Sequence, residues 1–97
     1  MQDKHKSKQI NNLVVYRERI GFTQQHVARL LGSRTVAQLS RFEKGHRFPN
    51  LRTALKLAII YRVPVDFLYA ALYQEYREVI RRREAVMSFP RQQVLPL

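Results

Sequence analysis

The three glycines of the chain restrict its fold more than any other feature. Gly21, Gly32 and Gly45 each follow a segment in which apolar residues recur every three or four positions, the spacing of one helix face. Glycine readily adopts the left-handed conformation that often ends a helix, so we expect each of these residues to end one. The three predicted helices cover residues 8–20, 24–31 and 36–44.

Polar capping residues mark where the predicted helices begin. Thr23 and Thr35 precede the second and third helices, where their side chains can accept a hydrogen bond from a free backbone N–H of the first turn. Asn50 and Asp66 stand in the same position before two further helical segments. These fourth and fifth helices are expected over residues 51–61 and 67–87. The inward face of the fourth is expected to contain Leu51, Ala54, Leu55, Ala58 and Ile59.

The pattern of the whole chain predicts an all-α fold. No segment alternates apolar and polar residues for long enough to form a convincing strand. Residues 1–7 are polar and charged, which predicts a flexible basic arm. Residues 88–97 contain two prolines and no periodicity, and we expect them to form a short coiled tail.

The charge of the chain favours a polyanionic partner. Its 97 residues include 18 Lys and Arg against 7 Asp and Glu, a formal net charge of +11 at pH 7. A charge of this size on so short a chain says nothing about the fold, but it attracts polyanions. The length itself leaves room for one compact domain.

Several chemistries have no support in the sequence. The chain has no cysteine, which excludes disulfides, Cys-based zinc sites and a thiol nucleophile. His5, His26 and His46 share no metal-ligand spacing, and no nucleophile and base fall together recognisably. We therefore predict no metal, no cofactor and no enzymatic activity. The sequence shows neither a signal peptide nor an apolar run that could cross a bilayer, so we expect a soluble, cytoplasmic protein.

Two short helices joined by a tight glycine-containing turn form the pattern of a helix-turn-helix, here over residues 24–42. In that motif the second helix lies in the DNA major groove and the first crosses the phosphate backbone. Leu39 and Phe42 are expected to point inward. Gln and Arg side chains match the hydrogen-bonding edges of adenine and guanine, and a small Ala allows close approach. The residues left outside are Ala37, Gln38, Ser40 and Arg41.

Two segments carry a family resemblance. Residues 22–32 (FTQQHVARLLG) place a Thr-Gln pair at the start of the second helix, followed by an Ala and a Gly at set spacing. Residues 39–49 (LSRFEKGHRFP) contain a Ser-Arg-apolar-Glu-x-Gly run and a Pro. Together they resemble the lambda-repressor/Cro-type (XRE) helix-turn-helix family over about residues 10–70. The resemblance implies a five-helix DNA-binding domain over residues 8–70, with residues 71–87 as an extension of the fifth helix.

The resemblance also implies roles for particular residues. Arg17 and Glu43 occupy positions that in this family form a buried ion pair between the first helix and the end of the third. The helix-turn-helix and the loop after it would contact bases and phosphates of double-stranded DNA. The residues expected there are Gln24, Gln25, Arg34, Thr35, Ala37, Gln38, Ser40, Arg41, Lys44, Arg47 and Asn50.

One departure from the family pattern affects the start of the third helix. Between Gly32 and Glu43 the chain has one residue more than the commonest spacing, which is expected to lengthen the turn. Val36 is then either a core residue or the first residue to face the groove. Its spacing of three from Leu39 favours the core, and Arg34 becomes a turn residue near phosphate.

The long fifth helix predicts an interaction surface. Its apolar and aromatic residues recur at helical spacing beyond the end of the family domain. They either pack on the chain's own helices or tail, or form the interface of a homodimer, which we favour because aromatic residues are enriched at such surfaces. The residues expected in the dimer interface are Leu68, Tyr69, Leu72, Tyr73, Tyr76 and Val79.

These features favour a sequence-specific DNA-binding transcriptional regulator, a repressor, that reads the major groove with the helix over residues 36–44. The alternative is an antitoxin-type protein that regulates its own operon and binds a protein partner through its C-terminal helix and tail. A non-specific nucleic-acid-binding protein would explain the charge but would leave the pattern of Gln24, Gln38 and Arg41 as coincidence.

Overall fold

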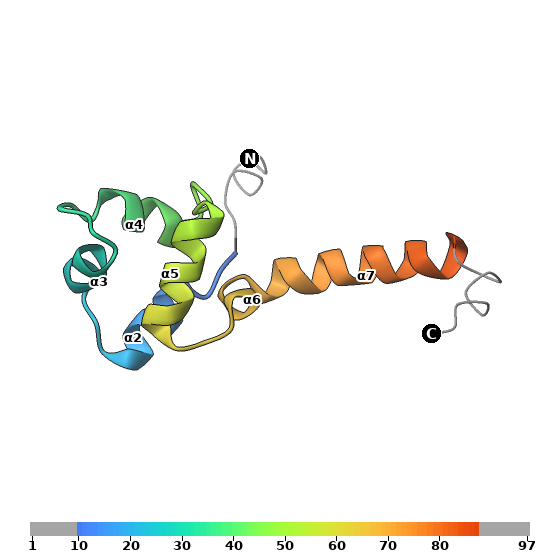
Figure 1. Cartoon of the computed structure of the whole chain (residues 1–97), viewed down its shortest axis with the longest axis horizontal. Coiled ribbons are helices and arrows are strands. Elements are labelled where there is room, and N and C mark those ends of the chain that lie inside the picture. The colour runs from blue at the N-terminus through green and yellow to red at the C-terminus, as the bar shows by residue number, and fades with distance from the viewer. Residues whose placement is uncertain (1–9, 88–97) are drawn as a thin grey trace, which may run out of the picture.

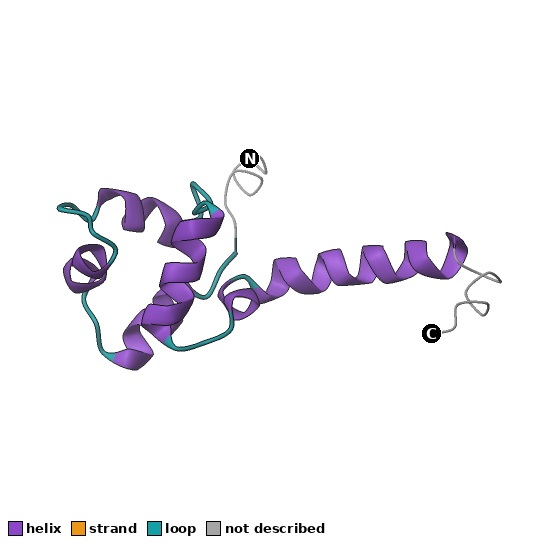
Figure 2. Cartoon of the chain, viewed as in Figure 1, coloured by secondary structure: helices purple, strands orange, loops and turns teal. Residues whose placement is uncertain are grey.

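The computed structural model describes residues 10–87, and every regular element in that range is a helix (Figure 1). Figure 2 shows helices and loops and no strand in the same range, so the predicted all-α fold is confirmed. The predictions for the N-terminal arm and the C-terminal tail concern residues outside the described range. The helices are α2 (Leu13–Ile20), α3 (Gln24–Leu30), α4 (Ala37–Glu43), α5 (Leu51–Tyr61), α6 (Val65–Leu68) and α7 (Ala70–Met87).

Two side-chain caps and the glycine stops form as predicted. Thr23 Oγ1 accepts a hydrogen bond from the backbone N–H of His26 at 3.0 Å and begins α3. Asn50 Oδ1 accepts one from the N–H of Thr53 at 2.9 Å and begins α5. Gly21, which follows α2, has a φ of 84°, a left-handed conformation that residues with a Cβ rarely adopt. These ends are therefore determined locally, by capping residues and glycine.

Two predicted helix starts are wrong. The first helix in the described range begins at Leu13, whereas the predicted helix included residues 10–12. Asn11 binds backbone groups outside a helix: its Oδ1 accepts from the N–H of Leu13, and its Nδ2 donates to the carbonyl of Phe42. The N-cap position of α4 is Val36, which offers no cap, rather than Thr35. Thr35 Oγ1 instead accepts a long 3.4 Å bond from the N–H of Ala37.

The predicted fifth helix is broken. Helix α6 ends at Leu68, Tyr69 has φ −131° and ψ 54°, and α7 begins at Ala70. The N-terminal segment causes this break, because the backbone N–H of Asn12 donates to the carbonyl of Leu68 and its Nδ2 donates to that of Phe67. In a continuous helix those carbonyls would accept from residues four positions further on.

The cap predicted for the fifth helix is also absent. Pro64 occupies the N-cap position of α6, and Asp66 lies inside the first turn without a side-chain cap hydrogen bond. A carboxylate there still lies close to the positive end of the helix dipole. Asp66 therefore stabilises the helix through its charge and not through a cap.

The hydrophobic core collects side chains from each of the five helices α2–α6, and its most deeply buried members come one or two from each helix. Each of these residues is at most 3% exposed, and the set comprises Leu13, Val27, Leu39, Phe42, Leu57 and Leu68. The inward face predicted for α5 is correct at Ala58 and wrong at three of its other residues. Leu57, Ala58 and Tyr61 are buried there, whereas Leu51, Leu55 and Ile59 are 45–75% exposed. Helix α5 is apolar on more than one side, and packing against α2 and α6 decides which side is buried.

Helix α7 projects away from the other helices (Figure 1). None of its 18 residues is buried. Its main tertiary contacts are with α6, from which it is separated by Tyr69 alone. Within the described range, no helix combines the length and apolar character that crossing a membrane requires.

Tyr69 joins α7 to the domain and carries a buried hydroxyl without a hydrogen-bond partner. Its ring lies against that of Phe48, with the two centroids 5.4 Å apart. Burial raises the pKa of the Tyr69 hydroxyl to about 12. An unfolded tyrosine ionises near pH 10, so the unfolded chain loses this proton first and the folded protein becomes less stable as the pH rises from about 10 to 12.

We therefore expect Tyr69→Phe to leave the free energy of unfolding at pH 7 unchanged or raised by up to about 1 kcal/mol, because it removes an unsatisfied polar group. At pH 11 the advantage of the variant should be larger. Urea unfolding at the two pH values measures both differences, and Tyr73→Phe, at a half-exposed side chain, is the control. A pH-independent difference for Tyr69→Phe would contradict the expectation.

Candidate nucleic-acid interface

Helix α4 presents one side to solvent. Ala37, Gln38 and Arg41 are exposed on it, and Lys44 continues the same side beyond the end of the helix. Leu39 and Phe42 anchor the opposite side in the core. The exposed side is therefore short, polar and held rigidly in place.

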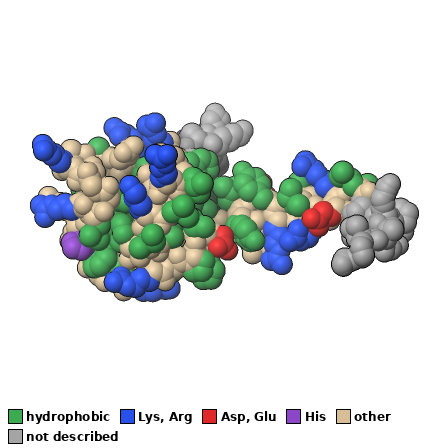
Figure 3. Space-filling model, in the orientation of Figure 1, with side chains coloured by type: hydrophobic (Ala, Val, Ile, Leu, Met, Phe, Trp, Pro, Cys, Tyr) green, Lys and Arg blue, Asp and Glu red, His purple; other side chains and the backbone are tan. Residues whose placement is uncertain are grey.

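The surroundings of α4 are strongly basic. Arg34 in the turn before the helix and Arg47 in the loop after it are exposed, as is Arg52 at the start of α5. The only acidic residue between Glu18 and Asp66 is Glu43. Figure 3 shows Lys and Arg side chains along the edges of the domain where α3 and α4 lie, with no acidic side chain on that part of the view. This end of the domain is suited to a polyanion.

Most residues expected to contact DNA lie on this surface. Ser40 is half-buried, and so is Gln24, whose side chain turns inward. Asn50 presents an exposed helix N-terminus, although its own side chain is engaged as the cap of α5. The exposed residues are Gln25, Arg34, Thr35, Ala37, Gln38, Arg41, Lys44, Arg47 and Asn50.

The turn between α3 and α4 is held by its own side chains. Ser33 Oγ donates to the carbonyl of Thr35 at 3.0 Å and accepts from its N–H at 3.3 Å. Val36 follows this turn and is half-buried, outside the group of fully buried core residues. It therefore fits neither alternative cleanly: it is half-buried but is not one of the residues packed against the core, and α4 begins with the exposed Ala37.

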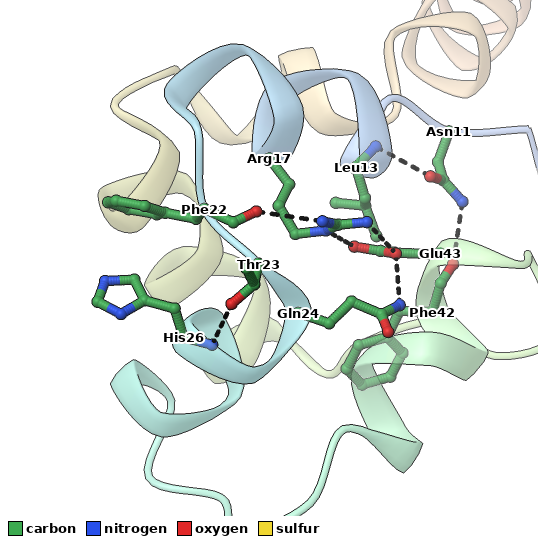
Figure 4. Close-up of polar contacts among 9 residues, drawn as sticks. All are labelled: Asn11, Leu13, Arg17, Phe22, Thr23, Gln24, His26, Phe42 and Glu43. Atoms are coloured by element: carbon green, nitrogen blue, oxygen red, sulfur yellow. Dashed lines mark hydrogen bonds and ion pairs between the residues drawn. The ribbon is translucent and has the colours of Figure 1, made fainter.

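An ion pair between Arg17 and Glu43 connects α2 to the last residue of α4 (Figure 4). Arg17 Nε lies 2.6 Å from Glu43 Oε2, and Arg17 Nη2 lies 3.1 Å from Oε1. The Glu43 side chain is 4% exposed and that of Arg17 14%. Arg17 also donates to the carbonyl of Phe22 at 3.1 Å. The hydrogen bond to Glu43 raises the pKa of Arg17 above its ordinary value.

Gln24 completes this network from the first turn of α3, where its Nε2 donates to Glu43 Oε1 at 2.8 Å (Figure 4). The carboxylate thus receives three hydrogen bonds, from two side chains on two helices. One buried acid fixes α2, α3 and the end of α4 relative to one another. Glu43 is consequently unavailable to repel a polyanion at the surface.

Because Gln24 donates to a buried carboxylate, we expect Gln24→Ala to lower the free energy of unfolding by about 1.5–3 kcal/mol, the usual effect of a hydrogen bond to a charged group. Gln25→Ala is the matched control, since Gln25 is exposed on the same turn and should change stability by less than about 0.5 kcal/mol. Chemical denaturation of both variants measures the difference. Equal effects would mean that the bond to Glu43 contributes nothing to folding.

Sequence reasoning missed the contribution of Asn11 and Asn12. Asn11 Nδ2 donates to the carbonyl of Phe42 at 3.0 Å, which holds the C-terminal end of α4 from the N-terminal segment. Two consecutive asparagines before an apolar segment are a signal that the helix starts later than its apolar spacing suggests, since Asn side chains compete for backbone groups. Within residues 10–87, no three His, Asp or Glu side chains lie close enough together to hold a metal ion.

Comparison with known proteins adds one finding. A helix-turn-helix family model matches residues 15–68 of the chain. The matched range begins inside α2 and ends at the last residue of α6, so α7 lies outside it. A search of curated proteins finds no match.

Proposed function

The chain belongs to the lambda-repressor/Cro-like (XRE) helix-turn-helix family, and on this premise we propose that it represses transcription by binding a specific double-stranded DNA operator in the major groove. The family consists of DNA-binding regulators of transcription and is not a family of enzymes. Repression would follow from occupying the operator, without any chemical step.

The observation that carries this proposal is the exposed side of α4 among basic residues. A helix with its side chains is about 10–12 Å wide, and the major groove is about 12 Å wide, so α4 fits into it. Arg41 and Gln38 are the side chains on this side that can bind guanine and adenine edges in pairs of hydrogen bonds. Ala37 allows the backbone to come close and can contact a thymine methyl group.

Other residues on the same surface are suited to the phosphate backbone. We assign this role to Arg34, Lys44 and Arg47, which are exposed around α4. The N-terminus of α5 at Asn50 offers free backbone N–H groups to an anion. At the start of α3, exposed Gln25 is available to phosphate, whereas the Gln24 amide group is already bound to Glu43. Phosphate contacts position the protein, and the base contacts of α4 select the sequence.

Specific binding of this kind favours a homodimer. One small domain contacts few base pairs, and helix-turn-helix dimers read two half-sites about 34 Å apart. Helix α7 lies outside the DNA-binding domain and exposes Tyr73 and Tyr76. The prediction that Leu68 lies in the dimer interface is wrong, because Leu68 is fully buried in the domain core and offers no surface to a partner. Tyr69 is half-buried against Phe48.

The proposal is tested by selecting bound sequences from random duplexes and then measuring affinities by fluorescence anisotropy over a salt series. We expect the selected sequence to bind about 10³-fold more tightly than its shuffled copy at physiological salt. The logarithm of affinity should fall with a slope of about −0.9 per phosphate contacted. Equal affinity for both duplexes, with the same slope, would reduce the function to charge-driven binding.

An antitoxin is the second candidate, because the exposed apolar side of α7 offers a surface to a different protein. This function requires a partner encoded beside the gene, and the tail at residues 88–97 would contribute to binding it. Removal of residues 88–97 should then abolish the partner complex and leave DNA binding intact. A complex that survives the truncation would argue against this assignment.

A further inference from the structure

Apolar side chains form a stripe along α7 that is interrupted at one position. Leu72, Tyr76, Val79 and Val86 follow the spacing of four, three and seven residues that keeps one side of a helix toward a partner. Position 83 completes the alternation of three and four, and arginine occupies it. We call positions 72, 76, 79, 83 and 86 the seam. Tyr76 and Val86 are 59% and 79% exposed, so the domain itself does not cover the stripe.

The two edges of the seam differ in chemistry. Tyr73, Ile80 and Met87 lie along one edge and are 45–74% exposed, which makes this edge apolar. Glu75 and Arg82 lie seven residues apart along the other edge and are both exposed. The apolar edge and the charged edge therefore run the length of the helix on opposite sides of the seam.

A helix in this situation needs a covering surface. Most helical stability in proteins comes from burying an apolar face rather than from the helix propensity of the residues. Helix α7 has 18 residues, none of them buried, and its main tertiary contacts are with α6. Burial of the seam against a partner would supply the missing stabilisation.

We propose that α7 pairs with α7 of a second copy of the chain in an antiparallel coiled coil, with Glu75 of each copy opposite Arg82 of the other. This inference rests on the dimer of the proposed function and adds its contact surface and orientation. The occupant is a second copy because the charged edge is self-complementary. When a two-fold rotation sets the two α7 helices antiparallel, Glu75 on the charged edge of one helix lies against Arg82 on the charged edge of the other.

Arg83 in the seam disfavours the parallel arrangement. In a parallel in-register pair each seam residue faces its own counterpart, so two arginine side chains would meet inside an apolar interface, where like charges repel and lose solvent. In the antiparallel pair Arg83 faces the partner's Leu72. The two arginines are then about 11 residues, or roughly 16 Å, apart along the axis.

The two edges favour the same orientation. In an antiparallel pair like edges face each other, so the apolar edges meet and the charged edges meet. In a parallel pair the charged edge of one helix faces the apolar edge of the other. Glu75 and Arg82 would then lie against Ile80 and Met87 of the partner without an opposite charge. The antiparallel pair leaves neither edge mismatched.

This pairing also suits two half-sites on DNA. When Leu72 faces the partner's Arg83, the two Ala70 residues, where the helices leave their domains, lie about 15 residues or roughly 22 Å apart along the axis. Each domain extends beyond its own attachment point. A separation of about 34 Å between the two recognition helices is therefore within reach.

Charge reversal of the full-length protein tests the pairing. Glu75→Arg places like charges at both symmetric contacts, and we expect it to weaken dimerisation about tenfold at low salt, as should Arg82→Glu. The double variant E75R/R82E restores opposite charges and should return the dissociation constant to within about threefold of the wild type. Glu78→Arg is the control, because it makes the same charge change at an exposed position outside the seam and its two edges.

Sedimentation equilibrium measures each dissociation constant. A monomeric wild type at about 100 µM would overturn the proposal, since no α7 pair would exist at a concentration that supports even weak dimers. Single reversals that match Glu78→Arg, or a double variant no better than the singles, would overturn the contact between Glu75 and Arg82.

Cysteine cross-linking tests the orientation separately, and the chain has no cysteine of its own to interfere. Mixed L72C and R83C chains should form a disulfide-linked dimer on oxidation, and L72C alone should not. Efficient self-linking of L72C would show a parallel pair and overturn the proposal. Neither experiment contains DNA, so the two proposals can fail independently. Loss of operator recognition would refute the proposed function and leave the α7 pair standing. Loss of the α7 pair would refute this inference and leave operator recognition standing.

Discussion

Replacement of Arg17 by methionine is expected to lower the free energy of unfolding by about 3–5 kcal/mol. The substitution keeps most of the side-chain volume but leaves the Glu43 carboxylate, whose side chain is 4% exposed, without its ionic partner. A lone buried charge carries its full desolvation penalty, with only the hydrogen bond from Gln24 left to offset it. Because small domains have about 5–15 kcal/mol of stability, the loss is a large fraction of the whole.

Chemical denaturation measures this loss, and the exposed pair of Arg81 and Glu84 supplies a matched control. Their side chains are 63% and 59% exposed, so Arg81→Met should cost less than about 0.5 kcal/mol. The double variant R17M/E43M removes both charges and should be more stable than R17M alone. If Arg17→Met cost no more than Arg81→Met, the ion pair would not be holding α2 to α4.

Replacement of Arg41 by alanine is expected to lower affinity for the selected operator by about 10- to 100-fold and to relax the preference for one base pair. A bidentate contact with a base edge contributes about 1–3 kcal/mol of discrimination, and the alanine variant cannot make it. Lys44→Ala should act differently, because a phosphate contact is independent of sequence. It should weaken binding to operator and shuffled DNA alike and reduce the salt slope by about 0.9.

Anisotropy titrations of both variants on the operator, on each single-base change and on shuffled DNA separate the two roles. Arg77→Ala is the control, since it removes an exposed arginine from α7 rather than from the surface around α4. Equal losses for Arg41→Ala on every duplex would assign Arg41 to the backbone and leave base reading to Gln38.

The sequence determined the parts of this protein that depend on neighbouring residues. Glycine after α2, and the Thr23 and Asn50 caps, end or begin helices through contacts within a few positions, so they could be read directly. The inward side of α4 was equally legible, because Leu39 and Phe42 are its only large apolar residues. The family motif gave the positions of Arg17 and Glu43, and the ion pair forms there.

The tertiary structure alone decided features in which a distant segment competes with local preference. The fifth helix breaks at Tyr69 because Asn12 takes the carbonyls of Phe67 and Leu68, 55 or more positions away in the chain. Gln24 turns from the surface because a buried carboxylate on α4 offers a stronger hydrogen bond than water does. Local sequence states what each residue prefers, and only packing shows which preference prevails.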